Sequence, residues 1–157
     1  MYHLHVAMTF DATAEAVFDQ IADHAVFLTG KGLVCQLVKE GSPDRNGRGA
    51  VREVKAGSML FSEEILEFDR PRRFDYKIVS AMDNGKPTPL DHERGWLTFE
   101  QVGTQTRVDW HTRFRVKVPV LGWFAERFFI ARTMKPKFLK LLEQARQRVE
   151  HSSASRS

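Results

Sequence analysis

The sequence predicts an α+β domain in which one antiparallel β-sheet packs against a long C-terminal helix. Residues 33–118 contain apolar or alternating segments separated by short turns rich in Gly, Pro, Asn and Asp, as in consecutive antiparallel strands. Residues 137–149 repeat apolar side chains at helical spacing. A sheet and a helix that each carry one apolar face bury those faces against each other, which gives the layered arrangement.

The N-terminal segment predicts a strand followed by two short helices. Apolar residues alternate along residues 2–10, as in a half-buried strand; they are Leu4, Val6, Met8 and Phe10. Thr13 is a residue type that caps helices. After it, apolar residues recur at helical spacing, namely Ala14, Val17, Phe18 and Ile21. Residues 24–29 predict a second, shorter helix that Gly30 terminates.

Further strands are expected at residues 33–40, 48–56, 59–68, 74–81, 92–102 and 105–118, which with the N-terminal strand make a seven-stranded sheet. The last two form a hairpin across the turn at residues 103–104. The register that pairs apolar side chains on one face places Leu97 opposite Trp110 and Phe99 opposite Val108. The inner face then carries Leu97, Phe99, Val108, Trp110, Thr112 and Phe114, and the outer face carries Trp96 and His111.

The C-terminal part is predicted to be helical. Residues 121–134 are rich in aromatic and aliphatic side chains, and Pro136 predicts a break near Lys135 because proline cannot donate a backbone hydrogen bond. Beyond the break, the residues on one helix face are Phe138, Leu142, Ala145 and Val149. The element order is strand, two helices, six strands and one long helix. We expect one domain over residues 1–149 and a disordered polar tail over residues 150–157.

The composition excludes several protein classes. The chain has 157 residues, of which 42% are hydrophobic and 28% are charged, values typical of a globular domain. Cys35 is the only cysteine, which excludes an internal disulfide and a Cys-based zinc cluster and indicates a reducing, cytoplasmic compartment. We expect it to be a small buried residue. No apolar run approaches the ~18 residues of a membrane span. The N-terminus lacks the basic leader and apolar core of a signal peptide.

Basic residues concentrate in the last third of the chain, where residues 107–157 carry 12 Lys and Arg against 4 Asp and Glu. Such a surface could meet anionic lipid, nucleic acid or an acidic partner. The charges form no continuous run, and the aromatic residues occupy the buried positions, so we expect a solvated basic face and no nucleic-acid binding. The apolar residues 118–124 have two interpretations: a lid with peripheral membrane contact, or the first turn of the long helix packed on the sheet.

One carboxylate of the middle strands is a candidate catalytic group. Pairing across the turn at residues 57–58 places Arg52 beside Glu63 as a surface ion pair, which contributes little to stability. The alternation along residues 62–68 directs Glu64 inward. A buried carboxylate has a raised pKa and could act as a general acid or base. The alternative interpretations of Glu64 are a structural carboxylate, or a β-bulge that turns it outward.

His3 and His5 put two imidazoles on one side of a strand, a geometry that can bind zinc. No third ligand lies near them in the sequence, so we interpret both as solvent-facing and expect no metal. The register places further polar residues of the final hairpin on the outer face: His92, Arg94, Asp109 and His111. An Asp–His pair for acid–base chemistry would need the opposite parity or a bulge. The nucleotide-binding and HExxH motifs are missing, so no cofactor is expected.

Three segments, taken together, resemble a known fold. They are DATAEAVFDQIAD (11–23), LEFDRPRRFDYKI (66–78) and GTQTRVDW (103–110), similar to the first helix, a Pro-containing hairpin and the turn into the last strand of the START-like superfamily. This superfamily includes the polyketide cyclase/dehydrase family, birch-pollen-allergen-like proteins and coenzyme-Q-binding proteins. The resemblance covers residues 2–149 and implies a helix-grip fold. The chain departs from common members because residues 25–29 contain no tryptophan, which leaves the subfamily open.

The resemblance implies a cavity between the sheet and the long helix. Apolar burial would bind a lipid, polyketide or quinone-like molecule there, and a few polar groups would orient it. The implied lining residues are Tyr76, Leu97, Phe99, Trp110, Phe114, Phe128, Phe138 and Leu142. The same aromatic residues could instead simply fill the core. The resemblance leaves two alternatives to a ligand-binding monomer or homodimer: a cyclase or dehydratase that uses Glu64 or Tyr76, and a non-catalytic protein-interaction module.

Overall fold

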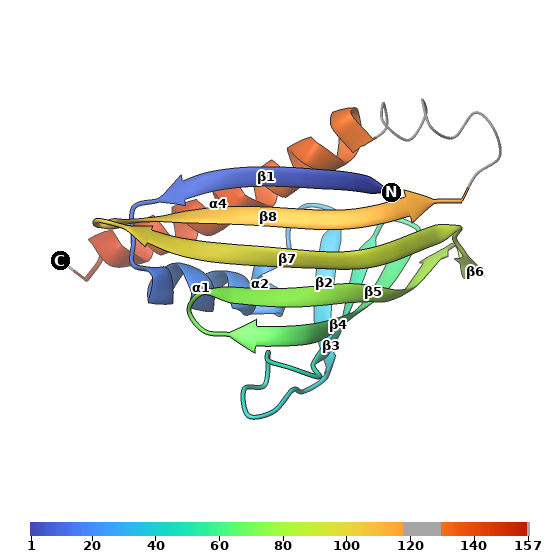
Figure 1. Ribbon diagram of the computed structural model, residues 1–157, viewed down its shortest axis with the longest axis horizontal. Helices are drawn as coiled ribbons and strands as arrows, with labels where there is room; N and C mark the ends of the chain where they lie inside the picture. The colour runs from blue at the N-terminus through green and yellow to red at the C-terminus, as the bar shows by residue number, and fades with distance from the viewer. Residues whose placement is uncertain (118–129, 157) are drawn as a thin grey trace.

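The computed structural model describes residues 1–117 and 130–156. Its elements are β1 (Tyr2–Phe10), α1 (Ala14–Ala22), α2 (His24–Phe27), β2 (Leu33–Lys39), β3 (Val51–Ala56), β4 (Met59–Asp69), β5 (Arg73–Asp83), β6 (Lys86–Pro87), β7 (Leu90–Val102), β8 (Gln105–Val116), the π-helix η1 (Ile130–Met134) and α4 (Lys135–Ala154). Figure 1 shows α4 running along one side of the sheet, with α1 and α2 on the same side. The segment considered as a lid, residues 118–124, lies outside the described residues.

The strands form one antiparallel sheet in the order β1-β8-β7-β5-β4-β3-β2, with β6 paired to β5. The predicted α+β arrangement is confirmed, but over the described residues the sheet has eight strands instead of seven. The additional strand lies in the expected loop after β5. Asn84 and Gly85 both have positive φ angles, 48° and 75°, which is the conformation that closes a two-residue hairpin. Lys86 can therefore pair with Asp83.

The start of α1 is set by its cap. The hydroxyl of Thr13 accepts a hydrogen bond from the backbone N–H of Ala16 at 3.3 Å, which satisfies one of the free donors of the first turn. The helix buries the apolar face that the sequence predicted. At its centre, Phe18 is fully buried and its ring contacts the rings of Phe68, Phe74 and Phe99. Helix α1 is thereby fixed on the inner face of the sheet.

The predicted register of the β7–β8 hairpin is confirmed. Leu97 lies opposite Trp110 and Phe99 opposite Val108, as expected from the pairing of apolar side chains. All six side chains predicted for the inner face are buried. Cys35 is also buried, as predicted, and burial raises the pKa of its thiol to about 11.

The geometry of the chain changes near Lys135, as Pro136 predicted. Residues up to Met134 form the π-helix η1, and α4 begins at Lys135 with the proline in its first turn, where the missing N–H has no cost. The prediction of a disordered tail from residue 150 is corrected by the structure. Helix α4 continues to Ala154, and the Glu150 carboxylate accepts a hydrogen bond from the backbone N–H of Asp11 at 3.0 Å. This contact connects the end of α4 to the end of β1.

We expect Phe18→Ala to lower the free energy of unfolding by about 3–5 kcal/mol, because the variant leaves a cavity between α1 and three aromatic rings. Urea denaturation followed by circular dichroism measures the change. Val79→Ala is the control, since Val79 is 53% exposed on β5 and its truncation should cost no more than about 0.5 kcal/mol. Equal losses in the two variants would contradict this account of the core.

Candidate functional site

A buried ion pair lies in the interior beside α2. Arg52 of β3 is 2% exposed, and its Nε donates to the Oε2 of Glu63 on β4 at 2.6 Å. The pairing of Arg52 with Glu63 was predicted, but its placement on the surface was wrong. Both residues occupy inward positions of strands whose opposite faces are solvated. A charged pair removed from water requires further polar partners, and the structure supplies them.

His24, the first residue of α2, is one of these partners. An Arg52 amino group lies 2.6 Å from the His24 Nδ1. Because arginine only donates, Nδ1 must be the acceptor, and the ring proton is on Nε2, which lies 3.0 Å from the backbone oxygen of Asn46. Burial and the charge of Arg52 both lower the pKa of His24 well below its ordinary value. The imidazole is therefore neutral, and its two hydrogen bonds connect the ion pair to the loop after β2.

Tyr76 of β5 continues the polar network toward β8. Its ring lies under the guanidinium of Arg52, 5.0 Å from the ring centre, and its hydroxyl accepts from the Trp110 Nε1–H at 3.0 Å. Burial, followed by the charge of Glu63, raises the pKa of Tyr76, so the phenol keeps its proton. The ring fits because Gly95 lies opposite on β7: a Cβ at this position would be 2.2 Å from the Tyr76 ring.

His92 of β7 was predicted on the outer face, and this prediction is wrong. A β-bulge between His92 and Arg94 turns the imidazole inward, where it stacks on Tyr76 with 5.6 Å between ring centres. Its Nδ1 accepts from the backbone N–H of Ile78 at 2.9 Å, so Nε2 carries the proton that faces the Thr112 hydroxyl at 2.9 Å. Burial is the main reason that the pKa of His92 falls to about 4.

The candidate catalytic carboxylate Glu64 is half-buried, and the buried carboxylate of β4 is its neighbour Glu63. A register shift between Ile65 and Glu67 explains the error. The bulge lets Ile65 and Phe68 pack on the same core although they are three positions apart. Strict alternation counted back from Phe68 therefore directs Glu64 inward, whereas the structure buries Glu63. The catalytic role of Glu64 stays a prediction.

The structure brings most of the predicted lining residues together. Tyr76, Leu97, Phe99, Trp110 and Leu142 belong to the main core, Phe114 lies in a smaller cluster, and Phe138 packs against both. Phe128 lies outside the described residues. The Trp110 and Phe138 rings stack with 4.0 Å between centres and 16° between planes. The cavity expected between the sheet and the long helix is therefore not open at these two rings, because the rings are in direct contact.

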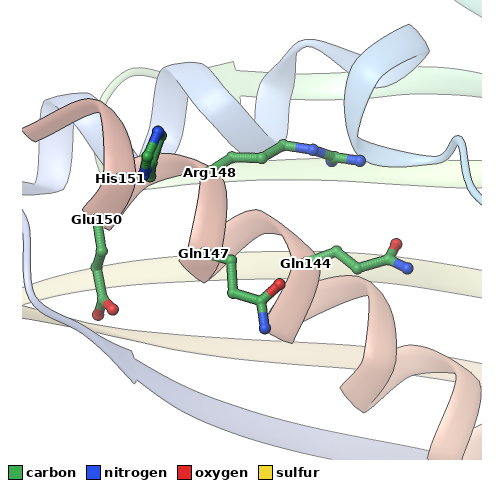
Figure 2. A pocket seen from close by; sticks show the side chains of 5 residues that line it. All are labelled: Gln144, Gln147, Arg148, Glu150 and His151. Carbon is green, nitrogen blue, oxygen red and sulfur yellow. The ribbon is translucent and has the colours of Figure 1, made fainter. Parts of the chain in front are cut away.

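Two open pockets are bordered by described residues. The larger, of about 690 Å³, lies along α4 and has a polar lining: Gln144, Gln147, Arg148, Glu150 and His151. Figure 2 shows these side chains spread along the helix. The smaller, of about 250 Å³, lies where β5 leaves β7 and pairs with β6. Neither contains a residue predicted to line a ligand cavity.

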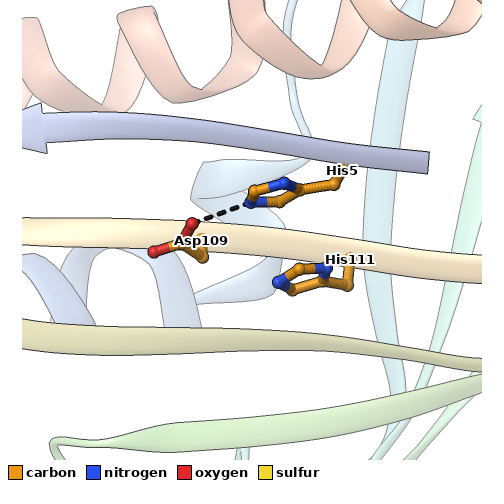
Figure 3. A group of neighbouring side chains, drawn as sticks. All are labelled: His5, Asp109 and His111. Carbon is orange, nitrogen blue, oxygen red and sulfur yellow. Dashed lines mark hydrogen bonds and ion pairs between the residues drawn. The ribbon is translucent and has the colours of Figure 1, made fainter. Parts of the chain in front are cut away.

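On the outer face of the sheet, four polar side chains gather that no local pattern in the sequence brings together. His3 and His5 come from β1, and pairing of β1 with β8 places His111 and Asp109 beside them. Figure 3 shows His5, Asp109 and His111 side by side on the two strands. No third ligand lies near the two histidines in the sequence, but the fold places Asp109 and His111 beside His5 although more than 100 positions separate them along the chain.

The described helices include none that is both long and apolar enough to cross a membrane. No curated protein matches the sequence. Solved structures of low identity share the fold. The protein TTHA0849 from Thermus thermophilus is 19% identical with a TM-score of 0.75, and the match covers 97% of this chain and 99% of that one. A START superfamily protein from Mycobacterium smegmatis is 14% identical with a TM-score of 0.68, over 96% and 99% of the two chains.

An aromatase/cyclase, Zhui from Streptomyces sp. R1128, is 15% identical with a TM-score of 0.67, and the match covers 94% of this chain and 95% of that one. These likenesses confirm the helix-grip arrangement of the START-like superfamily. A family model described as polyketide cyclase/dehydrase and lipid transport matches residues 1–150. The chain therefore belongs to the polyketide cyclase/dehydrase and lipid transport family.

Proposed function

We propose that this protein binds a hydrophobic small molecule of the lipid, polyketide or quinone type between the sheet and α4, with a polar group of the ligand held at Tyr76. The observation that carries the proposal is the buried polar network of Arg52, Glu63, Tyr76 and His92, which lies beside a large apolar core. Buried ion pairs contribute little to stability compared with apolar residues of similar volume. A few fixed polar groups beside an apolar wall are typical of ligand sites.

Phe138 is the side chain that the ligand would replace. It lies near the start of α4, it is half-buried, and it covers the face of the Trp110 indole. The same indole also contacts the buried polar network, because its Nε1–H donates to the Tyr76 hydroxyl. Rotation of the Phe138 side chain would expose a flat aromatic surface with a hydroxyl beside it. A planar ring system with one oxygen substituent fits that surface by stacking and by one hydrogen bond.

A cyclase or dehydratase is the second candidate function, and Tyr76 is the residue that favours it. A phenol that keeps its proton in the interior can donate that proton to a developing oxyanion. Glu63 is less suited, because its carboxylate is already paired with the guanidinium of Arg52. Turnover of a poly-β-ketone substrate that is lost in Tyr76→Phe, but kept in Glu64→Gln, would support this candidate. The converse would support Glu64.

We expect Phe138→Ala to bind the apolar dye 1-anilinonaphthalene-8-sulfonate at least five-fold more tightly than the wild type, because the variant exposes the Trp110 ring without competition. Dye fluorescence under titration measures the affinity. Phe68→Ala is the matched control, since Phe68 is also half-buried but contacts Phe18 and Phe74 instead of Trp110. Equal affinities in the two variants would argue against a site between Trp110 and Phe138.

We expect Tyr76→Phe to weaken binding of 2-naphthol by roughly five-fold, the equivalent of one lost hydrogen bond of about 1 kcal/mol. Naphthalene, which lacks the hydroxyl, should bind the variant and the wild type equally. Isothermal titration calorimetry compares the two compounds, and Tyr2→Phe serves as the control because Tyr2 lies on β1 beside Phe114. An equal loss for both compounds would show that Tyr76 only shapes the core.

A further inference from the structure

The outer face of β1 and β8 carries a compact set of nitrogen and oxygen ligands. The His5 Nε2 lies 2.7 Å from the Asp109 Oδ1, and the His5 and His111 rings stack in parallel with 4.1 Å between centres. One ligand atom from each of these three residues lies within 4.8 Å of the others. Because side chains alternate along a strand, this face is opposite to the inward-facing Trp110.

Two further side chains hold His111 in place. The His3 Nε2 lies 2.9 Å from the His111 Nδ1, which leaves the His111 Nε2 for another partner. The Trp96 indole stacks on the same imidazole with 4.8 Å between ring centres. A hydrogen bond to the second ring nitrogen and a fixed ring plane are the supports that metal-binding histidines commonly have.

We propose that His5, Asp109 and His111 bind a divalent transition-metal ion such as Zn²⁺, with solvent in the remaining position. Two imidazole nitrogens and one carboxylate oxygen are ligands that zinc accepts at about 2.0–2.2 Å. The two imidazoles stack in parallel, so the His5 ring must rotate to bring the ligand atoms onto one ion, and the 41% exposure of its side chain leaves room for that rotation. The site is independent of the proposed ligand site, which lies on the other face of the sheet.

Arg107 competes with the metal ion for the Asp109 carboxylate. Its Nε donates to the Asp109 Oδ2 at 2.8 Å, and its Nη2 donates to the Oδ1 at 3.0 Å, the oxygen that also faces His5. The guanidinium therefore neutralises the carboxylate that the ion needs, and it adds a like charge nearby. Its side chain is 51% exposed, so it can turn into solvent when the ion binds. Removal of this charge should strengthen metal binding.

Titration of the full chain with Co²⁺, followed by visible absorption, and with Zn²⁺, followed by calorimetry at pH 7.5, tests the proposal. We expect one ion per chain, with affinity at least ten-fold lower in His5→Ala and in His111→Ala, and several-fold higher in Arg107→Gln. His151→Ala is the matched control, since His151 lies on α4 away from the cluster. Circular dichroism establishes that each variant is folded.

Two results would overturn the proposal. One is a wild-type protein that binds Co²⁺ and Zn²⁺ no more tightly than folded His111→Ala. The other is a loss of affinity in His151→Ala as large as that in His5→Ala. Binding of the naphthalene probes plays no part in these measurements, so their outcome is independent of the outcome for the ligand site.

Discussion

The ion pair between Arg52 and Glu63 is the interaction on which the interior of this protein depends. It joins β3 to β4, fixes the tautomer of His24 at the start of α2, and places a cation over the ring of Tyr76. Loss of either partner would leave a charge buried without compensation, at a cost of about 3–5 kcal/mol. The same pair keeps the surrounding polar groups in one arrangement. Rigid polar groups in an apolar interior can orient a ligand without being reorganised by it.

The Phe138 side chain already fills the proposed ligand site, and this lowers the affinity for a ligand. Phe138 stacks on Trp110, so any guest at that surface must first displace an intramolecular aromatic contact. The measured affinity is then lower than the intrinsic affinity by the fraction of molecules in which the ring has moved. The ring belongs to the first turns of α4, directly after a π-helix, and π-helical turns frequently occur at functional sites. Of the described structure, the first turns of α4 are thus best suited to change conformation when a ligand displaces Phe138.

Local patterns in the sequence predicted much of the fold but less of the site. The β7–β8 register followed from apolar pairing because a two-residue turn leaves no freedom to slip. The errors at Glu64 and His92 share one physical cause: a β-bulge reverses which face a residue occupies, and alternation alone does not reveal it. The partners of His5 were missed for a different reason. Asp109 reaches it only through the pairing of the first strand with the last, which no local pattern encodes.

Gly95 and Tyr76 are distant in the sequence, but the Tyr76 ring occupies the space that a side chain at position 95 would need. With even one extra carbon at position 95, the phenol ring could not remain where it is, because the atoms would overlap. A methyl group there is tolerable only if position 76 shrinks at the same time. Across the natural relatives of this chain, the two sites should therefore covary, and glycine at the first should accompany an aromatic residue at the second.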